Sequence, residues 1–188
     1  MFKNFSIIIF FVLFLSSCFW GDDSIISSSQ DGLILAETPT MSMEIPSNWE
    51  IIKNKDWVLP KAKDWKIEFA VTSQKVTDGF ANNILVLSTD LKKTTTSKDF
   101  SMLNNVWANT EYLGYTEIES KEFDFLDEEK SILYIFEAKY NIDTPKLKFL
   151  QTAHLCTQKK AFFMTLAIPS SVKDTSKYEY LLSTFKCK

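Results

Sequence analysis

Two residues of this chain that are able to do chemistry lie two positions apart, His154 and Cys156. On a strand, side chains at positions i and i+2 share one face of the sheet. A cysteine beside a histidine is a pattern of nucleophilic catalysis and also of metal binding. The sequence contains one histidine and no CxxC or HExxH motif, so neither kind of site is completed. We therefore expect no catalytic, cofactor-binding or metal-binding site, and interpret His154 as a residue near the sheet edge or under a helix.

Carboxylates gather in one part of the chain, ahead of His154. They comprise Glu117, Glu119, Glu122 and Asp124, followed by Asp127-Glu128-Glu129. Paired carboxylates perform acid–base catalysis when they share a cleft. Positions along one strand do not establish a shared cleft, so a solvated strand and turn is the favoured interpretation.

Two tryptophans, Trp57 and Trp65, flank a loop that carries Pro60 and several lysines. Exposed aromatic side chains anchor protein partners, so this loop is a candidate partner-binding site. The alternative is that both rings fold back over the sheet.

The composition is that of one globular domain. Of the 188 residues, 45% are hydrophobic and 24% are charged, and the net charge is −3. All 21 basic residues are lysines, whereas proteins that grip phosphates or nucleic acids commonly use the bidentate guanidinium group of arginine. Only four glycines occur, which leaves little material for a phosphate-binding loop. We expect no nucleic-acid partner and no cofactor.

Most of the elements that position these residues are predicted strands. Apolar residues alternate or run together at residues 33–35, 41–45, 67–71, 83–89, 115–126, 132–140, 147–155 and 161–168. Residues 157–160 join the last two segments as a hairpin. Because strands that follow one another pair antiparallel, with helices packed on them, we expect an α+β fold. It would be a single, mainly antiparallel sheet of about six strands flanked by helices.

Two segments switch to a helical period. In residues 96–113 one stripe carries Phe100, Leu103, Val106, Trp107, Thr110 and Leu113, which predicts that this stripe faces the sheet. Thr96 and Asp99 fit a capping box at the start of this helix, and Gly114 is placed to end it. The second predicted helix follows a cap at Ser171–Asp174 and carries Tyr178, Leu181, Leu182 and Phe185.

The N-terminus resembles the leader of a bacterial lipoprotein. Lys3 precedes an apolar run at residues 5–15, which has the length of a secretory signal and is too short to span a membrane. Leu15-Ser16-Ser17-Cys18 resembles a lipobox, in which a peptidase cuts before the cysteine and the cysteine carries lipid. An ordinary secretory signal and a buried core helix are the alternatives.

This resemblance divides the chain into three parts: a signal peptide at 1–17, a lipidated Cys18 with a flexible tether at 18–32, and a domain at 33–188. Residues 19–31 are rich in Ser, Asp and Gly, as tethers are. We expect the domain to lie on the exported face of a bacterial cell-envelope membrane, anchored through the lipid on Cys18.

Export bears on the two remaining cysteines, because disulfides persist outside the cytosol. The final predicted helix returns antiparallel to the strand at 161–168. Its end near Cys187 should therefore lie beside the hairpin that carries Cys156. This arrangement predicts a Cys156–Cys187 disulfide, and the alternative is two unpaired thiols.

An ordered set of short motifs resembles the PsbP/Mog1-like (DcrB/PsbP-like) family. It opens with Met43-Glu44-Ile45-Pro46-Ser47-Asn48-Trp49 and continues with Asn82-Asn83-Ile84-Leu85-Val86. The capped helix, the hairpin at 148–168 and Ser183-Thr184-Phe185 complete it. The resemblance covers residues 35–185 and implies an α/β/α sandwich that acts as a non-enzymatic accessory or interaction domain.

These observations together predict a lipid-anchored cell-envelope protein that acts as a non-catalytic protein-binding or accessory module, with an envelope protein as its partner. The alternative is a small-ligand carrier or a hydrolase with a cleft near His154. That alternative requires a concave apolar pocket with converging polar groups.

Overall fold

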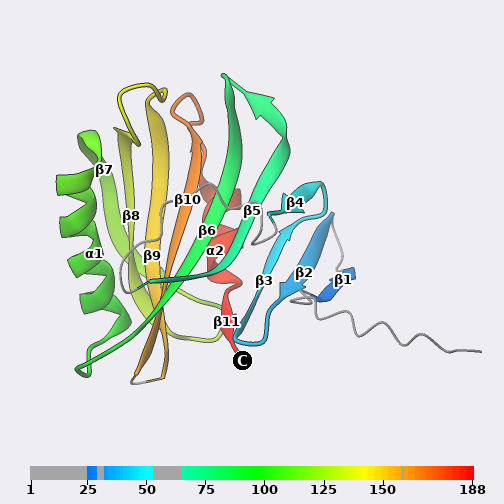
Figure 1. Cartoon of the computed structure of the whole chain (residues 1–188), viewed down its shortest axis with the longest axis vertical. Helices are drawn as coiled ribbons and strands as arrows, with labels where there is room; N and C mark the ends of the chain where they lie inside the picture. The colour runs from blue at the N-terminus through cyan, green and yellow to red at the C-terminus, as the bar shows by residue number, and fades with distance from the viewer. Residues whose placement is uncertain (1–24, 29–31, 53–64, 158) are drawn as a thin grey trace, which may run out of the picture.

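The computed structural model describes residues 25–28, 32–52, 65–157 and 159–188 (Figure 1). The predicted signal peptide at 1–17, Cys18 and Trp57 lie outside the described residues. The described part of the chain forms eleven strands and two helices. In chain order they are β1 (Ile25–Ser28), β2 (Leu33–Glu37), β3 (Met41–Pro46), β4 (Trp49–Ile51), β5 (Lys66–Thr77), β6 (Phe80–Asp90), α1 (Ser97–Glu111), β7 (Leu113–Asp124), β8 (Lys130–Lys139), β9 (Leu147–Thr157), β10 (Lys160–Pro169), α2 (Ser176–Ser183) and β11 (Lys186–Cys187).

The strands form two sheets, and all the pairs of neighbouring strands are antiparallel. The larger sheet has seven strands in the order β4-β5-β6-β10-β9-β8-β7, and its last four strands along the chain form the predicted meander. The second sheet has the order β1-β2-β3-β11 and joins the two ends of the described chain. β1 lies in the predicted tether, so folded structure begins before residue 33.

The seven-stranded sheet is covered differently on its two faces, as alternation along β10 shows. Phe162, Met164 and Leu166 point into the main core, which they share with the second sheet and α2. We call this the second-sheet face. Phe163 and Ala167 point to the other side, toward α1 and the smaller apolar clusters beside it. We call this the α1 face.

The expected α+β fold, a single sheet of about six strands in an α/β/α sandwich, is wrong. The structure is mainly β, with two sheets and two helices in its described residues. The chain changes sheets at Pro46, which has no amide to continue a ladder, and β4 starts the larger sheet after a turn. The second covering layer is therefore a sheet with α2 beside it, where Glu44 N donates to Thr184 Oγ1 at 2.9 Å.

Helix α1 starts where the sequence predicts but turns a different stripe toward the sheet. Asp99 N donates to Thr96 Oγ1 at 3.1 Å, which caps the helix. Phe100 of the predicted stripe is buried, but Leu103, Val106 and Trp107 are 56%, 63% and 60% exposed, so the prediction is wrong for the middle of the helix. The buried side chains are Ser97, Phe100, Ser101 and Ala108, three of them small, and they let the helix approach the strands closely. The two serines are held by hydrogen bonds: Ser101 Oγ donates to Ile132 O, and Leu155 N donates to Ser97 Oγ.

Candidate functional site

A pocket of about 400 Å³ lies on the α1 face of the seven-stranded sheet, next to the C-terminal end of α1. Three neighbouring strands form its floor. They contribute Ala70 and Thr72 from β5, Leu85 from β6, and Thr165 and Ala167 from β10. Four of these five side chains are small, and larger side chains at these positions would fill the pocket.

The walls of the pocket are aromatic, and α1 leaves the space between them uncovered. α1 packs mainly on β8 and β9, while β5 and β6 lie away from it (Figure 1). Phe80, Tyr112 and Tyr140 line the pocket together with Thr144 from the β8–β9 loop. The Tyr112 ring contacts Phe149 and Tyr140, with ring centroids 4.8 and 6.2 Å apart, so one wall is firmly packed.

The pocket is electrically neutral. None of the described residues that line it carries a charge. Burial raises the pKa of Tyr112 to about 12, with Tyr140 adding to the shift and the Gln151 side chain opposing it. The phenol therefore stays protonated at neutral pH. Gln151 Nε2 donates to Thr165 Oγ1 at 3.0 Å, which leaves the Thr165 hydroxyl hydrogen to donate to another atom. This lining suits an apolar ligand with one polar end.

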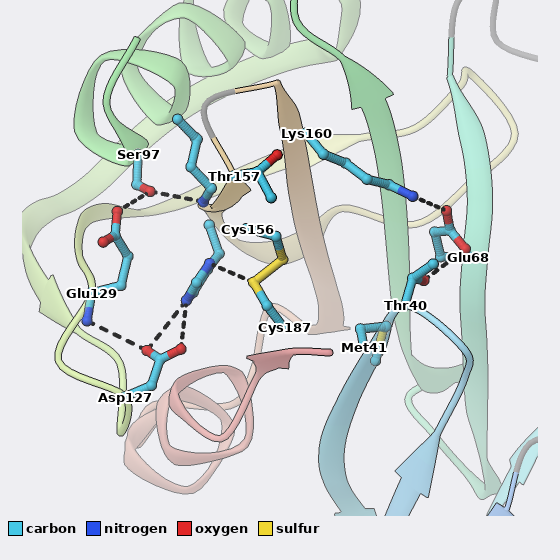
Figure 2. The surroundings of a disulfide bond; sticks show 12 residues. Thr40, Met41, Glu68, Ser97, Asp127, Glu129, Cys156, Thr157, Lys160 and Cys187 are labelled. Carbon is cyan, nitrogen blue, oxygen red and sulfur yellow. Dashed lines mark hydrogen bonds and ion pairs between the residues drawn. A yellow bond between two sulfur atoms is a disulfide. The ribbon is translucent and has the colours of Figure 1, made fainter. Parts of the chain in front are cut away.

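A second cluster of reactive groups lies on the second-sheet face, around His154. Figure 2 shows its members Asp127, Cys156 and Cys187. His154 is 3% exposed and packs against the rings of Phe125 and Phe185. Its Nε2 atom lies 3.0 Å from Asp127 Oδ2, and its Nδ1 atom lies 3.4 Å from Cys187 Sγ. The Asp127 carboxylate and the Cys187 sulfur thus contact the two nitrogen atoms of one buried imidazole ring.

Cys156 and Cys187 form a disulfide in the structure, with Cα atoms 5.3 Å apart. The bond joins the end of β9 to β11, where Cys187 pairs with Met41 of β3. The sequence analysis paired these two cysteines, and the disulfide ties the C-terminus to both sheets. It also brings both sulfur atoms and His154 Nδ1 to within 4.8 Å of one another.

Asp127 is a member of this cluster that sequence reasoning missed. The sequence places Asp127 in an acidic turn that is expected to be solvated. Its position in that turn is the one feature of the sequence that could have pointed to a specific contact. The turn is held rigidly: Phe125 N donates to Glu129 O at 2.9 Å, and Ser97 Oγ donates to Glu129 Oε1. Glu128 has a φ of 72°, in the left-handed region. These restraints direct the Asp127 carboxylate at the buried histidine.

The four carboxylates of β7 lie on exposed positions, as the simpler interpretation expects: Glu117, Glu119, Glu122 and Asp124. β7 is an edge strand, and its side chains are largely exposed. Lysines neutralise several of them, with Lys98 Nζ 2.5 Å from Glu122 and Lys121 Nζ 3.4 Å from Glu119. Charged side chains on an edge strand disfavour pairing with another sheet. Nothing in this arrangement brings two carboxylates into a shared cleft.

Trp65 folds back onto the protein. Its ring centroid lies 5.9 Å from that of Phe100 and 6.1 Å from that of Phe163, so it packs beside α1. This matches the alternative that the sequence analysis left open. The predicted partner-binding role of Trp57 concerns a residue outside the described ranges.

The pocket and the His154 cluster lie on opposite faces of the sheet. His154 does not line this pocket, so the pocket is not the cleft near His154 that the alternative hypothesis requires. In the described ranges, no helix is long and apolar enough to cross a membrane.

Comparison with known proteins adds little. No family model matches the chain, and no curated protein matches it. A crystal structure of a protein from Bacteroides thetaiotaomicron VPI-5482 is similar over 79% of this chain, with 10% identity and a TM-score of 0.41. The similar region covers 45% of that protein, so this chain spans less than half of its length.

Proposed function

We propose that this protein is a non-catalytic binding protein, whose domain takes up an uncharged, mainly apolar small molecule in the pocket on the α1 face. The pocket itself carries this proposal. Its volume of about 400 Å³ lies within the range of about 300–1,000 Å³ typical of small-molecule sites. Its lining combines aromatic walls with a few polar groups, which is the usual composition of such sites.

The polar groups of the pocket would bind the polar end of a ligand. Asn83, Thr144 and Thr165 supply hydroxyl and amide groups to a lining that is mainly apolar. A ligand with a hydrocarbon or aromatic body and one neutral hydrogen-bonding group fits this distribution. A carboxylate or phosphate would lose its hydration without gaining a cation, so charged ligands are disfavoured.

Binding of a neutral fluorescent probe, N-phenyl-1-naphthylamine, tests the proposal on the full chain. We expect saturable binding of one probe per chain. Ala167→Leu places a larger side chain on the pocket floor and should weaken binding at least tenfold. Ser120→Leu adds the same side chain on exposed β7 and should leave binding unchanged. Urea midpoints of both variants check that they fold. Equal affinities for the wild type and both variants would contradict the proposal.

We propose further that the protein is held on the exported face of a bacterial membrane by lipid on Cys18. The lipobox-like Leu15-Ser16-Ser17-Cys18 after an apolar leader supports this. Acyl chains contribute about 0.8 kcal/mol per buried CH₂, and two or more chains anchor a domain stably. Cys18→Ser should abolish labelling with radioactive palmitate and release the protein from membranes, whereas Ser17→Ala should change neither. Membrane association that survives Cys18→Ser would contradict lipid anchoring.

A second candidate function is docking of an envelope protein partner on the outer side of α1. Four apolar side chains there are largely exposed: Met102, Leu103, Val106 and Trp107. Exposed apolar groups gathered on one helix are typical of protein-interaction surfaces. A photo-crosslinking residue at position 107 should give one discrete adduct in native membranes, and the same residue at exposed position 177 should not. An adduct that persists after Leu103→Ser and Val106→Ser would argue against this surface.

A further inference from the structure

The Nδ1 atom of His154 is buried and faces a sulfur atom that has no hydrogen to donate to it. Asp127 Oδ2 lies 3.0 Å from Nε2, and in the ring tautomer that donates from Nε2 to this carboxylate the other nitrogen, Nδ1, is an acceptor. The neighbouring atom is Cys187 Sγ, at 3.4 Å. A sulfur atom in a disulfide has no hydrogen to donate. A lone pair on a 97% buried side chain therefore points at sulfur with no donor on the other side.

The distance between His154 Nδ1 and Cys187 Sγ matches that between two ligands of a tetrahedral metal site. With metal–sulfur bonds of about 2.3 Å and metal–nitrogen bonds of about 2.0–2.1 Å, a ligand nitrogen and a ligand sulfur lie about 3.5 Å apart. The observed separation between His154 Nδ1 and Cys187 Sγ is 3.4 Å. All three ligand atoms, from His154, Cys156 and Cys187, lie within 4.8 Å of one another.

We infer that reduction of the Cys156–Cys187 disulfide converts this cluster into a binding site for a thiophilic d¹⁰ metal ion, Zn²⁺ or Cu⁺. The ligands are the two cysteine sulfurs and His154 Nδ1. This set of soft sulfur and imidazole ligands suits both ions. It leaves the fourth position of Zn²⁺ to water and completes a three-coordinate site for Cu⁺.

The chemistry balances with a dithiol as the reductant. A dithiol gives two electrons and two protons to the S–S bond, which becomes two thiols, and the reductant leaves as a disulfide. The metal ion then binds both sulfurs and releases two protons. The sulfurs must separate to about 3.8 Å, the edge of a tetrahedral site. Cys187 lies on β11, a strand of two residues, so the separation requires a shift of this short element alone.

Asp127 acts in this site as a positioning residue. Metal-binding histidines donate their second ring nitrogen to a carboxylate or carbonyl group, which sets the ring orientation and the tautomer. Asp127 Oδ2 at 3.0 Å from Nε2 provides this contact, and the restrained turn at residues 125–129 keeps it in place.

Metal titration of the full chain, reduced with a phosphine under argon, tests the inference. With Co²⁺ as a spectroscopic probe, we expect thiolate-to-cobalt charge-transfer bands, one ion per chain, and displacement of Co²⁺ by Zn²⁺. A parallel competition against a Cu⁺ chelator measures Cu⁺. The oxidised wild type should bind neither ion at this site. Asp127→Asn should weaken binding 10–100-fold while the two thiolates remain.

His154→Gln distinguishes the proposed site from a simple pair of thiols. The inference requires that this variant lose at least tenfold in affinity and shift the Co²⁺ bands. Equal affinity of His154→Gln and wild type, or binding by the reduced protein no tighter than by the oxidised protein, would overturn it. Near-UV circular dichroism follows the fold throughout. If the reduced protein unfolds, recovery of the native spectrum on adding Zn²⁺ supports the site, and continued unfolding at saturating Zn²⁺ overturns it.

Discussion

The two faces of the seven-stranded sheet use the same strands for opposite purposes. On β10, Phe162, Met164 and Leu166 are fully buried against the second sheet and α2. Between them, Thr165 and Ala167 face the other way and form the floor of the pocket. Because alternate residues of one strand point to the two faces, the same strand can pack in a filled core on one face and line a pocket on the other. The pocket is thus a product of side-chain size, on a backbone that a complete core holds in place.

If the pocket binds a ligand as proposed, the residues that stabilise the fold and those that bind the ligand lie largely on different faces of the sheet. The second-sheet face supplies the larger share of the apolar burial, the disulfide and the ion pairs at its rim. The α1 face supplies a neutral space and a helix that covers part of the sheet. Substitutions on the first face should therefore change the free energy of unfolding, and substitutions around the pocket should mainly change binding.

The largest expected effect comes from a matched pair of leucine truncations on the two faces. Leu166→Ala removes a fully buried side chain from the main core, and should lower the free energy of unfolding by about 3–5 kcal/mol. Leu85→Ala removes the same group from the pocket floor, where the space already opens to ligand. Its expected cost is about 1–2 kcal/mol, the loss of partial burial without a new closed cavity.

Urea unfolding of the two variants, followed by circular dichroism, measures both values. The comparison between the faces fails if Leu85→Ala costs as much as Leu166→Ala. Such a result would mean that the pocket is closed by packing in solution.

The next effect is that of the Cys156–Cys187 disulfide, which belongs to the second-sheet face. The bond closes a loop with a sequence separation of 31 residues. Loop-closure entropy predicts that its reduction lowers the free energy of unfolding by about 3–4 kcal/mol. Urea unfolding with and without reductant, in metal-free buffer, checks this. The double variant Cys156→Ser and Cys187→Ser should match the reduced protein and be insensitive to reductant. Two free thiols in the native protein would show that the bond does not form.

A smaller effect is expected at Glu68, on the rim of the second-sheet face. Its side chain is 3% exposed and accepts hydrogen bonds from Ser88 Oγ at 2.6 Å, Lys66 Nζ at 2.9 Å and Thr40 Oγ1 at 3.2 Å. Burial alone would raise the pKa of Glu68. The hydrogen bonds from Ser88 and Lys66 and the charges of Lys66 and Lys160 outweigh burial, so its pKa is lowered.

Glu68→Gln should therefore cost about 1–3 kcal/mol at neutral pH, since it removes charge-assisted hydrogen bonds from a buried site. A lowered folded-state pKa stabilises the fold above the unfolded pKa of about 4.3, and this stabilisation is lost as pH falls through the folded value. The difference between wild type and Glu68→Gln should be largest above about pH 5 and shrink on acidification. Thermal unfolding at a series of pH values measures it, and a difference that grows toward low pH would contradict the assignment.

Local signals in the sequence were enough to locate most elements. The capping pair Thr96 and Asp99, the alternation along β8 to β10 and the terminal helix all lie within a few residues of their predicted positions. These signals depend on contacts between near neighbours in the chain. The cysteine pairing also followed from them, because it required only the direction of the last helix relative to the last long strand.

Features that depend on distant partners were not predictable in this way. The second sheet depends on β11, a strand of two residues that pairs with β3 at the far end of the chain. Residues from β5, β6, β10 and the β8–β9 loop line the pocket, and its volume is set by the gap that their side chains leave between them. Asp127 reaches His154 only because the turn at 125–129 is folded against α1 by Ser97 and Glu129.

The smallest expected effect concerns α1, where the sequence pattern and the structure disagree about which stripe faces the sheet. The apolar stripe that includes Trp107 predicts burial, yet it faces outward, because Ser97 Oγ accepts a hydrogen bond from Leu155 N and Ser101 Oγ donates one to Ile132 O. Trp107→Ser should therefore change the free energy of unfolding by no more than about 0.5 kcal/mol, as is usual for surface positions. Phe100→Ser on the same helix is the matched control and should cost at least about 3 kcal/mol, because its ring is buried against β9 and β10. Urea unfolding separates the two outcomes, and a loss at Trp107 as large as that at Phe100 would mean that the helix packs through the stripe that the sequence predicts.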